Sequence, residues 1–417
     1  MRAIALPAMN PAIFQFPSSR AQALKRLADF APGAGRDYAA RRNYDLGPGD
    51  RSNVSGLSGA VRHRLVLEEE LVRTAIATHG LRAAEKFVQE VCWRTYWKGW
   101  LEMRPAVWAR YRRERDDALA DLDTVPSLRR RYEAAIGGRT GIACFDAWAG
   151  ELIDHGYLHN HARMWFASIW IYTLNLPWTL GADHFLRHLI DGDAASNTLS
   201  WRWVGGLHTR GKTYLARADN IAAFTGGRFD IDAGQLAASA PALCETGEEP
   251  ACQPLQTAGR PDPSAPTLLL LHEEDLHQQS WPVDGLDVRG IASLDALGWR
   301  SPMPIGEQAQ AFTRHAIADA AERAGAQHAC PVTAIAASGS LAGTAAGCGA
   351  SQIVTMRAMT GPLKDRLDAE REALAAAGIG LVELRHDWDV QFHPHARRGF
   401  FKLKEAIPGV LTALGIN

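Results

Sequence analysis

The spacing of apolar residues changes once along this 417-residue chain, and that change limits the possible folds more than any other feature. From Ala21 to Asn220 apolar residues recur every three or four positions, as in 81–100 and 145–176, which predicts amphipathic helices. Residues 233–266 are rich in Ala, Pro, Gly and Glu, which is typical of a linker. Short apolar or β-branched runs then alternate with helical patterns, which predicts a parallel sheet. The predicted strands are 267–271, 332–336, 353–356 and 380–384, and helical patterns between them include 308–324 and 363–376.

The chain is long enough to bury two cores. Its length exceeds that of most single domains, and its composition, 47% hydrophobic and 22% charged, is that of a globular protein. We expect a mainly α-helical domain at residues 1–232, a linker at 233–266 and a smaller α/β, Rossmann-like domain at 267–417.

The net charge of −1 hides two halves of opposite sign. Residues 1–230 contain 31 Lys and Arg against 24 Asp and Glu, whereas the remainder contains 14 against 22. A basic half suits a polyanionic partner. We expect the acidic half to face away from that partner.

The sequence shows no sign of secretion, membrane insertion or metal binding. The six cysteines are scattered without a C-x-x-C pair, and residues 1–17 do not have the basic and apolar regions of a signal peptide. No window reaches the roughly 18 apolar residues of a membrane span. We expect a cytoplasmic protein without a bound metal, and we interpret one polar cluster as a surface turn: His386, Asp387, Asp389, His393 and His395.

The segment from Asp191 to Trp203 is the most informative about chemistry. It places the carboxylates of Asp191 and Asp193, the amide of Asn197 and the indoles of Trp201 and Trp203 within thirteen residues. Each of these alone has a structural explanation, with Asp191 as a helix cap and the tryptophans as core. Together they predict a pocket that binds a ring.

Two predicted helices each carry three functional side chains at positions i, i+3 and i+4, a spacing that brings them to one face. In each triplet one side chain is polar or acidic, one is an arginine, and one is a methionine or a tryptophan. Charged faces of helices usually point to water. Their occurrence together with the pocket segment favours a shared site. The two triplets are Asn160, Arg163, Met164 and Glu90, Trp93, Arg94.

With these motifs, the stretch from about Tyr38 to Tyr214 resembles nearly the whole helical flavin-binding domain of the DNA photolyase/cryptochrome family. Separate family signatures match 140–146, 159–164 and 191–203, in the family's order and at its approximate spacing. The resemblance implies flavin adenine dinucleotide (FAD) as cofactor and DNA as partner. It also implies the reaction of a deoxyribodipyrimidine photo-lyase, which is light-driven repair of cyclobutane pyrimidine dimers by electron transfer.

The resemblance implies the cofactor contacts residue by residue. Arg163 and Asp191 match a salt bridge beside the isoalloxazine, Asp193 matches the carboxylate at the ring's amide edge, and Asn197 matches the amide facing flavin N5. Arg94 matches a flavin-contacting arginine, and Asn160 belongs to the same set. The pyrophosphate would be held by Tyr38 and by the loop of Ser52, Asn53, Val54 and Ser55.

The lesion cavity and the electron path are implied in the same way. The family's cavity for a flipped-out dimer matches Glu90, Trp93, Asn160, Met164 and Trp203, and the catalytic set comprises Glu90, Asn160, Asn197, Trp178 and Trp201. Family members that repair the pyrimidine–pyrimidone photoproduct have histidines at Asn160 and Met164, so the cyclobutane lesion is favoured. Trp178 and Trp201 match the inner steps of a tryptophan chain that reduces the flavin. Residues 117–131 contain no outer step, so we expect the chain to leave through Trp170, Tyr172, Tyr111 or Tyr132.

The sequence departs from the family pattern at two places, and alternatives remain open. A Rossmann-like antenna domain normally precedes the flavin domain; here residues 267–417 are interpreted either as that domain relocated or as an unrelated nucleotide-binding or docking module. His161 stands where the family has arginine. We expect a monomer that prefers single-stranded DNA. The alternatives to repair are a cryptochrome-like blue-light receptor and a flavin-bearing DNA-binding protein without turnover.

Overall fold

The computed structural model describes residues 16–245 and 250–416, and in it the chain is mainly helical from Arg20 to Phe224. Residues 1–15 of the predicted first domain and 246–249 of the predicted linker lie outside that description. Among the described residues, no helix combines the length and the apolar composition that crossing a membrane requires. The helices are α1 (Arg20–Phe30), α2 (Arg36–Arg41), α3 (Ser58–Arg62), α4 (Glu68–Glu102), α5 (Pro105–Thr124), α6 (Pro126–Ile136), α7 (Ala143–His155), α8 (Asn160–Ser168), α9 (Trp178–His188), α10 (Ala194–Val204) and α11 (Ala218–Phe224).

Two glycines divide the helical patterns seen in the sequence. Gly80 has φ of +71°, so α4 bends there, and the predicted helix at 81–100 is confirmed as its second part. Gly156, with φ of +62°, ends α7 and splits the 145–176 pattern into α7 and α8. Positive φ is favourable for glycine because it has no Cβ. These bends direct the faces of α4 and α8 that carry the predicted site residues.

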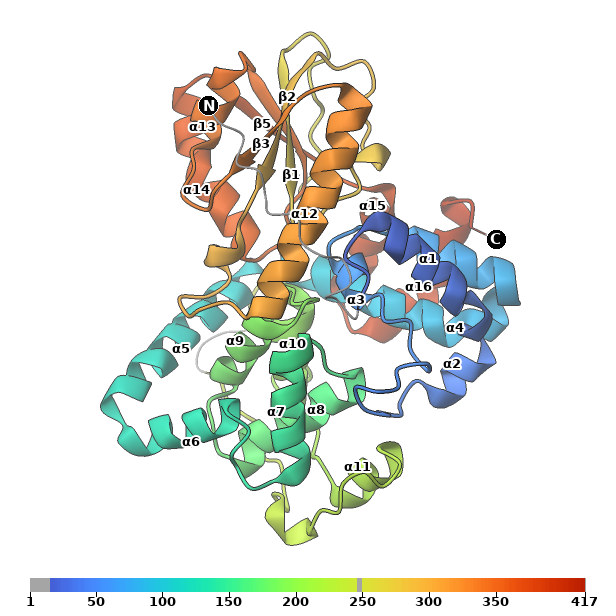
Figure 1. The fold of residues 1–417 in the computed structure, drawn as a ribbon, viewed down its shortest axis with the longest axis vertical. Coiled ribbons are helices and arrows are strands. Elements are labelled where there is room, and N and C mark those ends of the chain that lie inside the picture. The colour runs from blue at the N-terminus through green and yellow to red at the C-terminus, as the bar shows by residue number, and fades with distance from the viewer. Residues whose placement is uncertain (1–15, 246–249, 417) are drawn as a thin grey trace.

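A five-stranded parallel sheet follows, with the strand order β3-β2-β1-β4-β5 (Figure 1). Its central strand β1 is buried along its whole length, as expected for a strand covered on both faces. The predicted fold class, a helical part followed by an α/β part, is confirmed. The strands are β1 (Thr267–His272), β2 (Val288–Leu294), β3 (Val332–Ile335), β4 (Gln352–Met356) and β5 (Gly380–Leu384), and α12 (Glu307–His328), α13 (Leu341–Gly347) and α14 (Pro362–Ala376) connect them.

The last two helices lie against the first half of the chain. Both α15 (Asp387–Phe392) and α16 (Phe400–Ala413) pack against α4 (Figure 1). The Trp388 indole donates a 2.9 Å hydrogen bond to Thr95 Oγ1 on α4. The boundaries at residues 232 and 266 therefore remain a prediction, because part of the segment 267–417 completes the packing of α4.

Buried ion pairs join the two halves. Arg64, before α4, pairs with Asp389 at 2.8 Å and with Asp275 at 3.3 Å. His393 lies 3.2 Å from Glu102 at the end of α4 and is fully buried. The interpretation of the 386–395 cluster as a surface turn is thus wrong for Asp389 and His393, whose side chains are buried in this interface.

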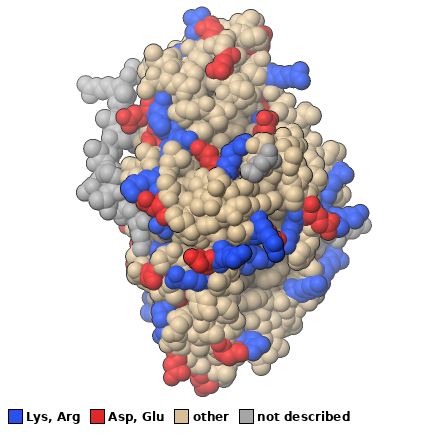
Figure 2. Space-filling model, turned by 90° about the vertical axis from the view of Figure 1, so that its right-hand side faces the viewer, with Lys and Arg blue, Asp and Glu red and all other residues tan. Residues whose placement is uncertain are grey.

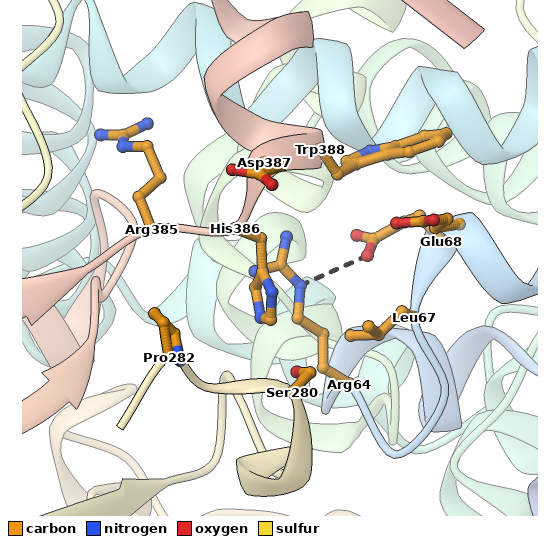
Figure 3. A pocket seen from close by; sticks show the side chains of 10 residues that line it. Arg64, Leu67, Glu68, Ser280, Pro282, Arg385, His386, Asp387 and Trp388 are labelled. Carbon is orange, nitrogen blue, oxygen red and sulfur yellow. Dashed lines mark hydrogen bonds and ion pairs between the residues drawn. The ribbon is translucent and has the colours of Figure 1, made fainter. Parts of the chain in front are cut away.

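A hollow of about 270 Å³ opens at this junction (Figure 3). Arg64 and Glu68 line it from the first half, and His386 and Asp387 line it from the segment after β5. His386 Nε2 lies 2.6 Å from Asp275 Oδ2, so its imidazole belongs to the same ion-pair network. The hollow is lined by groups that hold the two halves together.

Candidate functional site

Two arginines and two aspartates meet where α4, α8 and α10 converge. Arg163 Nη2 lies 3.0 Å from Asp191 Oδ2, and Arg94 Nη1 lies 2.6 Å from Asp193 Oδ2. Arg94 also lies 3.9 Å from Asp191, which links the pairs into one cluster. Burial alone would raise the pKa of Asp191, but the guanidinium groups of Arg163 and Arg94 outweigh it and lower that pKa. Both aspartates therefore remain ionised at neutral pH.

Asp193 also determines where α10 begins. Its Oδ1 accepts hydrogen bonds from the backbone N–H groups of Ala195 at 2.9 Å and Ser196 at 3.1 Å, and Oδ2 accepts from the Ser196 hydroxyl. The helix cap of this segment is thus Asp193 and not Asp191. With both oxygens occupied, Asp193 fixes α10 and holds Arg94 at the same time.

Asn197 and Trp201 on α10 face α9. Asn197 Nδ2 donates to the carbonyl of Ala182 at 2.7 Å, which leaves its amide oxygen and one N–H for another partner. Trp201 packs so closely on α9 that a Cβ added at Gly181 would lie 2.3 Å from its ring. Glycine at position 181 is therefore required for the buried position of this indole.

Two routes of aromatic contacts lead away from the predicted inner tryptophans. The Trp201 ring lies 6.1 Å from Trp170. The Trp178 ring lies 5.7 Å from Tyr111, which lies 5.1 Å from Trp108. Trp170 and Tyr111 were among the predicted exits, and Trp108 was not.

The predicted phosphate loop is braced by side chains from other segments. Arg26 donates to the carbonyls of Val54 and Ser55 at 3.0 and 2.7 Å. Asn53 is buried and uses its amide N–H groups on the carbonyls of Arg41 and Tyr44, each at 2.8 Å. Asn53 thus ties the loop to the end of α2, and the Ser52 and Ser55 hydroxyls remain the candidates for an anion.

Tyr38 lies on α2, beside this loop. Its ring packs edge-on against Phe87 of α4 at 5.3 Å. Burial raises the pKa of the Tyr38 hydroxyl, so the group is neutral. Tyr38 can therefore offer a phosphate an uncharged hydrogen-bond donor.

Glu90 and Trp93, predicted to line the lesion cavity from α4, have partners that the sequence did not reveal. Glu90 Oε1 lies 3.1 Å from Arg42 Nη1. Burial raises the pKa of Glu90, although Arg42 and Lys86 act in the opposite direction. The Trp93 indole stacks on Phe400 of α16 with ring centroids 3.6 Å apart.

The other predicted lesion residues lie on α8 and α10. Asn160, the first residue of α8, is exposed, whereas Met164 and Trp203 are half-buried. Trp203 packs on Tyr214 at 5.7 Å. His161 is buried, stacks on Trp165 at 4.0 Å and therefore does not replace the family's arginine at the surface.

The ionised side chains of this cluster lie where three helices meet, beside a parallel α/β part, and they offer charged and hydrogen-bonding groups to a polar cofactor. Residues 87–258 match the family model of the FAD binding domain of DNA photolyase. This part of the chain therefore resembles the flavin-binding domain of the DNA photolyase/cryptochrome family.

Curated relatives include the deoxyribodipyrimidine photo-lyases of Streptomyces griseus and Thermus thermophilus. The former is 34% identical over 194 residues, covering 43% of this chain and 41% of the relative. The latter is 34% identical over 150 residues, covering 36% and 35%. This chain thus spans less than half the length of these relatives.

Solved structures that match part of this chain include a class III photolyase from Agrobacterium tumefaciens and a cryptochrome from Synechocystis. The former has a TM-score of 0.38 and 22% identity, and the match covers 50% of this chain and 43% of that one. The latter has a TM-score of 0.42 and 19% identity, and the match covers 54% of this chain and 49% of that one.

The charge cluster fits FAD. Two buried polar atoms of the 191–203 segment, Asp191 Oδ1 in the cluster and Trp201 Nε1 on α10, have no hydrogen-bond partner within the described residues. Buried polar atoms are rarely left in that state. A flavin edge carries N–H and C=O groups, which are the partners that these atoms and the Asn197 amide can take.

Proposed function

We propose that this protein repairs cyclobutane pyrimidine dimers in DNA, with FAD and light. One observation carries the proposal: the three helices that meet at the charge cluster also carry all five predicted lesion residues. Arg94 shares α4 with Glu90 and Trp93, Arg163 shares α8 with Asn160 and Met164, and Asp193 caps the helix of Trp203. The predicted contacts for cofactor and lesion are therefore built on the same rigid elements.

FAD, when bound, supplies the light-driven one-electron chemistry that opens the cyclobutane ring. The chain's own residues bind and orient. The indoles of Trp93 and Trp203 can stack on bases, and such stacking is worth roughly 1–3 kcal/mol per base. Glu90 can accept hydrogen bonds from the N–H groups on a base edge. Arg94 and Arg163 keep two carboxylates ionised in the pocket.

A repair assay tests the proposal directly. The purified, reduced protein is illuminated with a dimer-containing oligonucleotide, and the absorbance of restored thymines is followed. We expect recovery that requires light. Flavin-loaded protein that binds the oligonucleotide but restores no thymine would contradict the proposal and would favour a flavin-bearing DNA-binding protein without turnover.

The proposal includes a preference for single-stranded DNA, a monomeric state and a cytoplasmic location. Repair rates on matched single- and double-stranded oligonucleotides test the first, and sedimentation tests the second. Fractionation of cells tests the third.

Glu90→Gln should lower repair yield without changing the flavin spectrum. The substitution keeps the size of the side chain but removes a charged acceptor, and hydrogen bonds to charged groups contribute roughly 1.5–3 kcal/mol. Repair per absorbed photon and dimer affinity are measured side by side. Glu69→Gln, an ion-paired glutamate near the start of the same helix, is the matched control. Equal yields in all three proteins would exclude Glu90 from the lesion site.

Trp201→Phe should slow light-driven reduction of the bound flavin, because it removes the indole that is predicted as an inner step of the electron path and that contacts Trp170. Trp170→Phe and Tyr111→Phe then distinguish the two aromatic routes. The flavin absorbance under illumination with an external reductant is the readout. Unchanged kinetics in the Trp201 variant would show that electrons enter elsewhere.

A further inference from the structure

The segment Arg397–Lys404 differs in charge from the half of the chain that contains it. Its sequence, Arg-Arg-Gly-Phe-Phe-Lys-Leu-Lys, has four cations, two aromatic rings and no carboxylate. It runs from the end of the 3-10 helix His393–Arg397 into the first turns of α16. The acidic total of residues 231–417 therefore conceals a short basic and aromatic stretch.

This segment is fixed beside the predicted lesion residue Trp93. Phe400 is buried and stacks on the Trp93 indole with an interplanar angle of 10°. Arg104 donates a 2.8 Å hydrogen bond to the carbonyl of Arg397. Lys404 Nζ lies 3.2 Å from Glu85 on α4. The segment is thus attached to α4 through Lys404 and to the start of α5 through Arg397, on either side of the stacked rings.

The side chains next to Phe400 are open to solvent. Phe401 is 76% exposed, the largest value among the exposed large hydrophobic side chains of the described chain. Arg397 and Arg398 are exposed, and within the described residues their guanidinium groups make no hydrogen bond or ion pair. Figure 2 shows the face that carries α1, α2, α4 and α16 in Figure 1, with Lys and Arg side chains in a band across its middle.

We propose that residues 397–404 form part of the DNA-binding surface. Arg397 and Arg398 bind phosphates beside the lesion, the Phe401 ring packs on a base of the same strand, and Phe400 orients the Trp93 indole. Cations interleaved with exposed aromatic rings are the combination that binds single-stranded nucleic acid. The inference rests on the proposed function for the role of Trp93, and it revises the expectation that the whole acidic half faces away from DNA.

The double variant Arg397→Ala, Arg398→Ala tests the phosphate contacts. Binding of full-length, flavin-loaded protein to an undamaged single-stranded oligonucleotide is measured across a series of salt concentrations. Each lost contact should reduce the log–log salt slope by roughly 0.7, so the expected reduction is about 1.4. The control Arg289→Ala, Arg314→Ala removes two arginines of the α/β part that are 55% and 50% exposed. Equal slopes for the test variant and the wild type would overturn the proposal.

Phe401→Ala tests the stacking contact. Since base stacking on an aromatic ring contributes roughly 1–3 kcal/mol, affinity should fall about 5- to 150-fold, and Phe401→Trp should restore it. Flavin content and circular dichroism confirm that each variant is folded. An unchanged affinity in folded Phe401→Ala would show that the ring does not contact DNA.

The same titrations with a dimer-containing oligonucleotide separate this inference from the proposed function. If the wild type binds damaged and intact DNA equally and repairs no dimers, the proposed function fails, regardless of the affinities of the variants. If the wild type repairs dimers but the arginine and phenylalanine variants bind DNA with the same affinity and salt dependence as the wild type, only the inference fails.

Discussion

The double variant Arg163→Ala, Asp193→Ala is expected to purify without FAD. Each substitution removes one partner of a buried ion pair and leaves Asp191 and Arg94 without their closest counter-charges. Breaking a buried pair from one side typically costs about 3–5 kcal/mol. Loss of Asp193 also removes the cap of α10, the helix that carries Asn197. Together these effects should weaken flavin binding by several hundred-fold or more.

Flavin absorbance after gel filtration and a titration with added FAD measure this effect. The matched control is Arg217→Ala, Asp219→Ala, which removes an exposed Arg–Asp pair in which both side chains are about two-thirds exposed. The control should keep its flavin. A test variant that retains full binding would show that the cofactor lies outside the Arg94, Arg163, Asp191 and Asp193 cluster.

Glu102→Ala is expected to destabilise the folded protein strongly. Glu102 ends α4 and accepts from Arg357 at 3.0 Å, from Arg385 at 3.0 Å and lies 3.2 Å from His393. Its removal leaves the buried Arg385 guanidinium without its ion-pair partner, and leaves Arg357 and His393 only the longer contacts to Glu383 at 3.8 Å and Asp389 at 3.5 Å. Breaking a buried pair from one side should lower the free energy of unfolding by about 3–5 kcal/mol. Denaturant unfolding measures it, with the half-exposed Glu133→Ala as control. A change below 1 kcal/mol would mean that the halves do not depend on this contact.

Acid should destabilise the wild type through the same group. Burial by itself would raise the pKa of Glu102, but His393 and Arg385 outweigh it and lower that pKa to about 2. A carboxyl whose pKa is lowered by folding stabilises the protein above its ordinary value in the unfolded chain and loses that contribution as pH falls to the folded value. Stability should therefore decline from about pH 5 to about pH 2. The decline should be shallower in Glu102→Gln.

Local patterns in the sequence were sufficient to predict the helices and most strands. The predicted strands match β1, β3, β4 and β5 closely. The strand β2 was missed because Arg289, Gly290 and Ala292 interrupt its apolar character, and glycine and alanine are poor strand formers. Its position is set by backbone pairing with β1, which no local signal reveals.

Contacts between distant parts of the chain explain what the sequence did not predict in the site. Motif resemblance led to Arg163 and Asp191, and their ion pair is present at 3.0 Å. The resemblance could not predict the ion pair of Glu90 with Arg42 or the stacking of Trp93 on Phe400, because these partners lie on other elements and follow no periodic spacing. For Phe400 a signal did exist, since adjacent aromatic residues among lysines and arginines are unusual for a solvated helix end.

The pairing of Arg64 has a consequence for biosynthesis. Its partners Asp275 and Asp389 lie 211 and 325 residues further along the chain. At a translation rate of about 5–20 residues per second, Arg64 leaves the ribosome roughly 15 to 65 seconds before Asp389 does. During that interval a nascent chain has α4 but not α15 or α16, so Arg64 lacks its Asp389 partner and the Trp93 indole lacks Phe400. The helical half can thus reach its final packing only after the ribosome has synthesised nearly the whole protein.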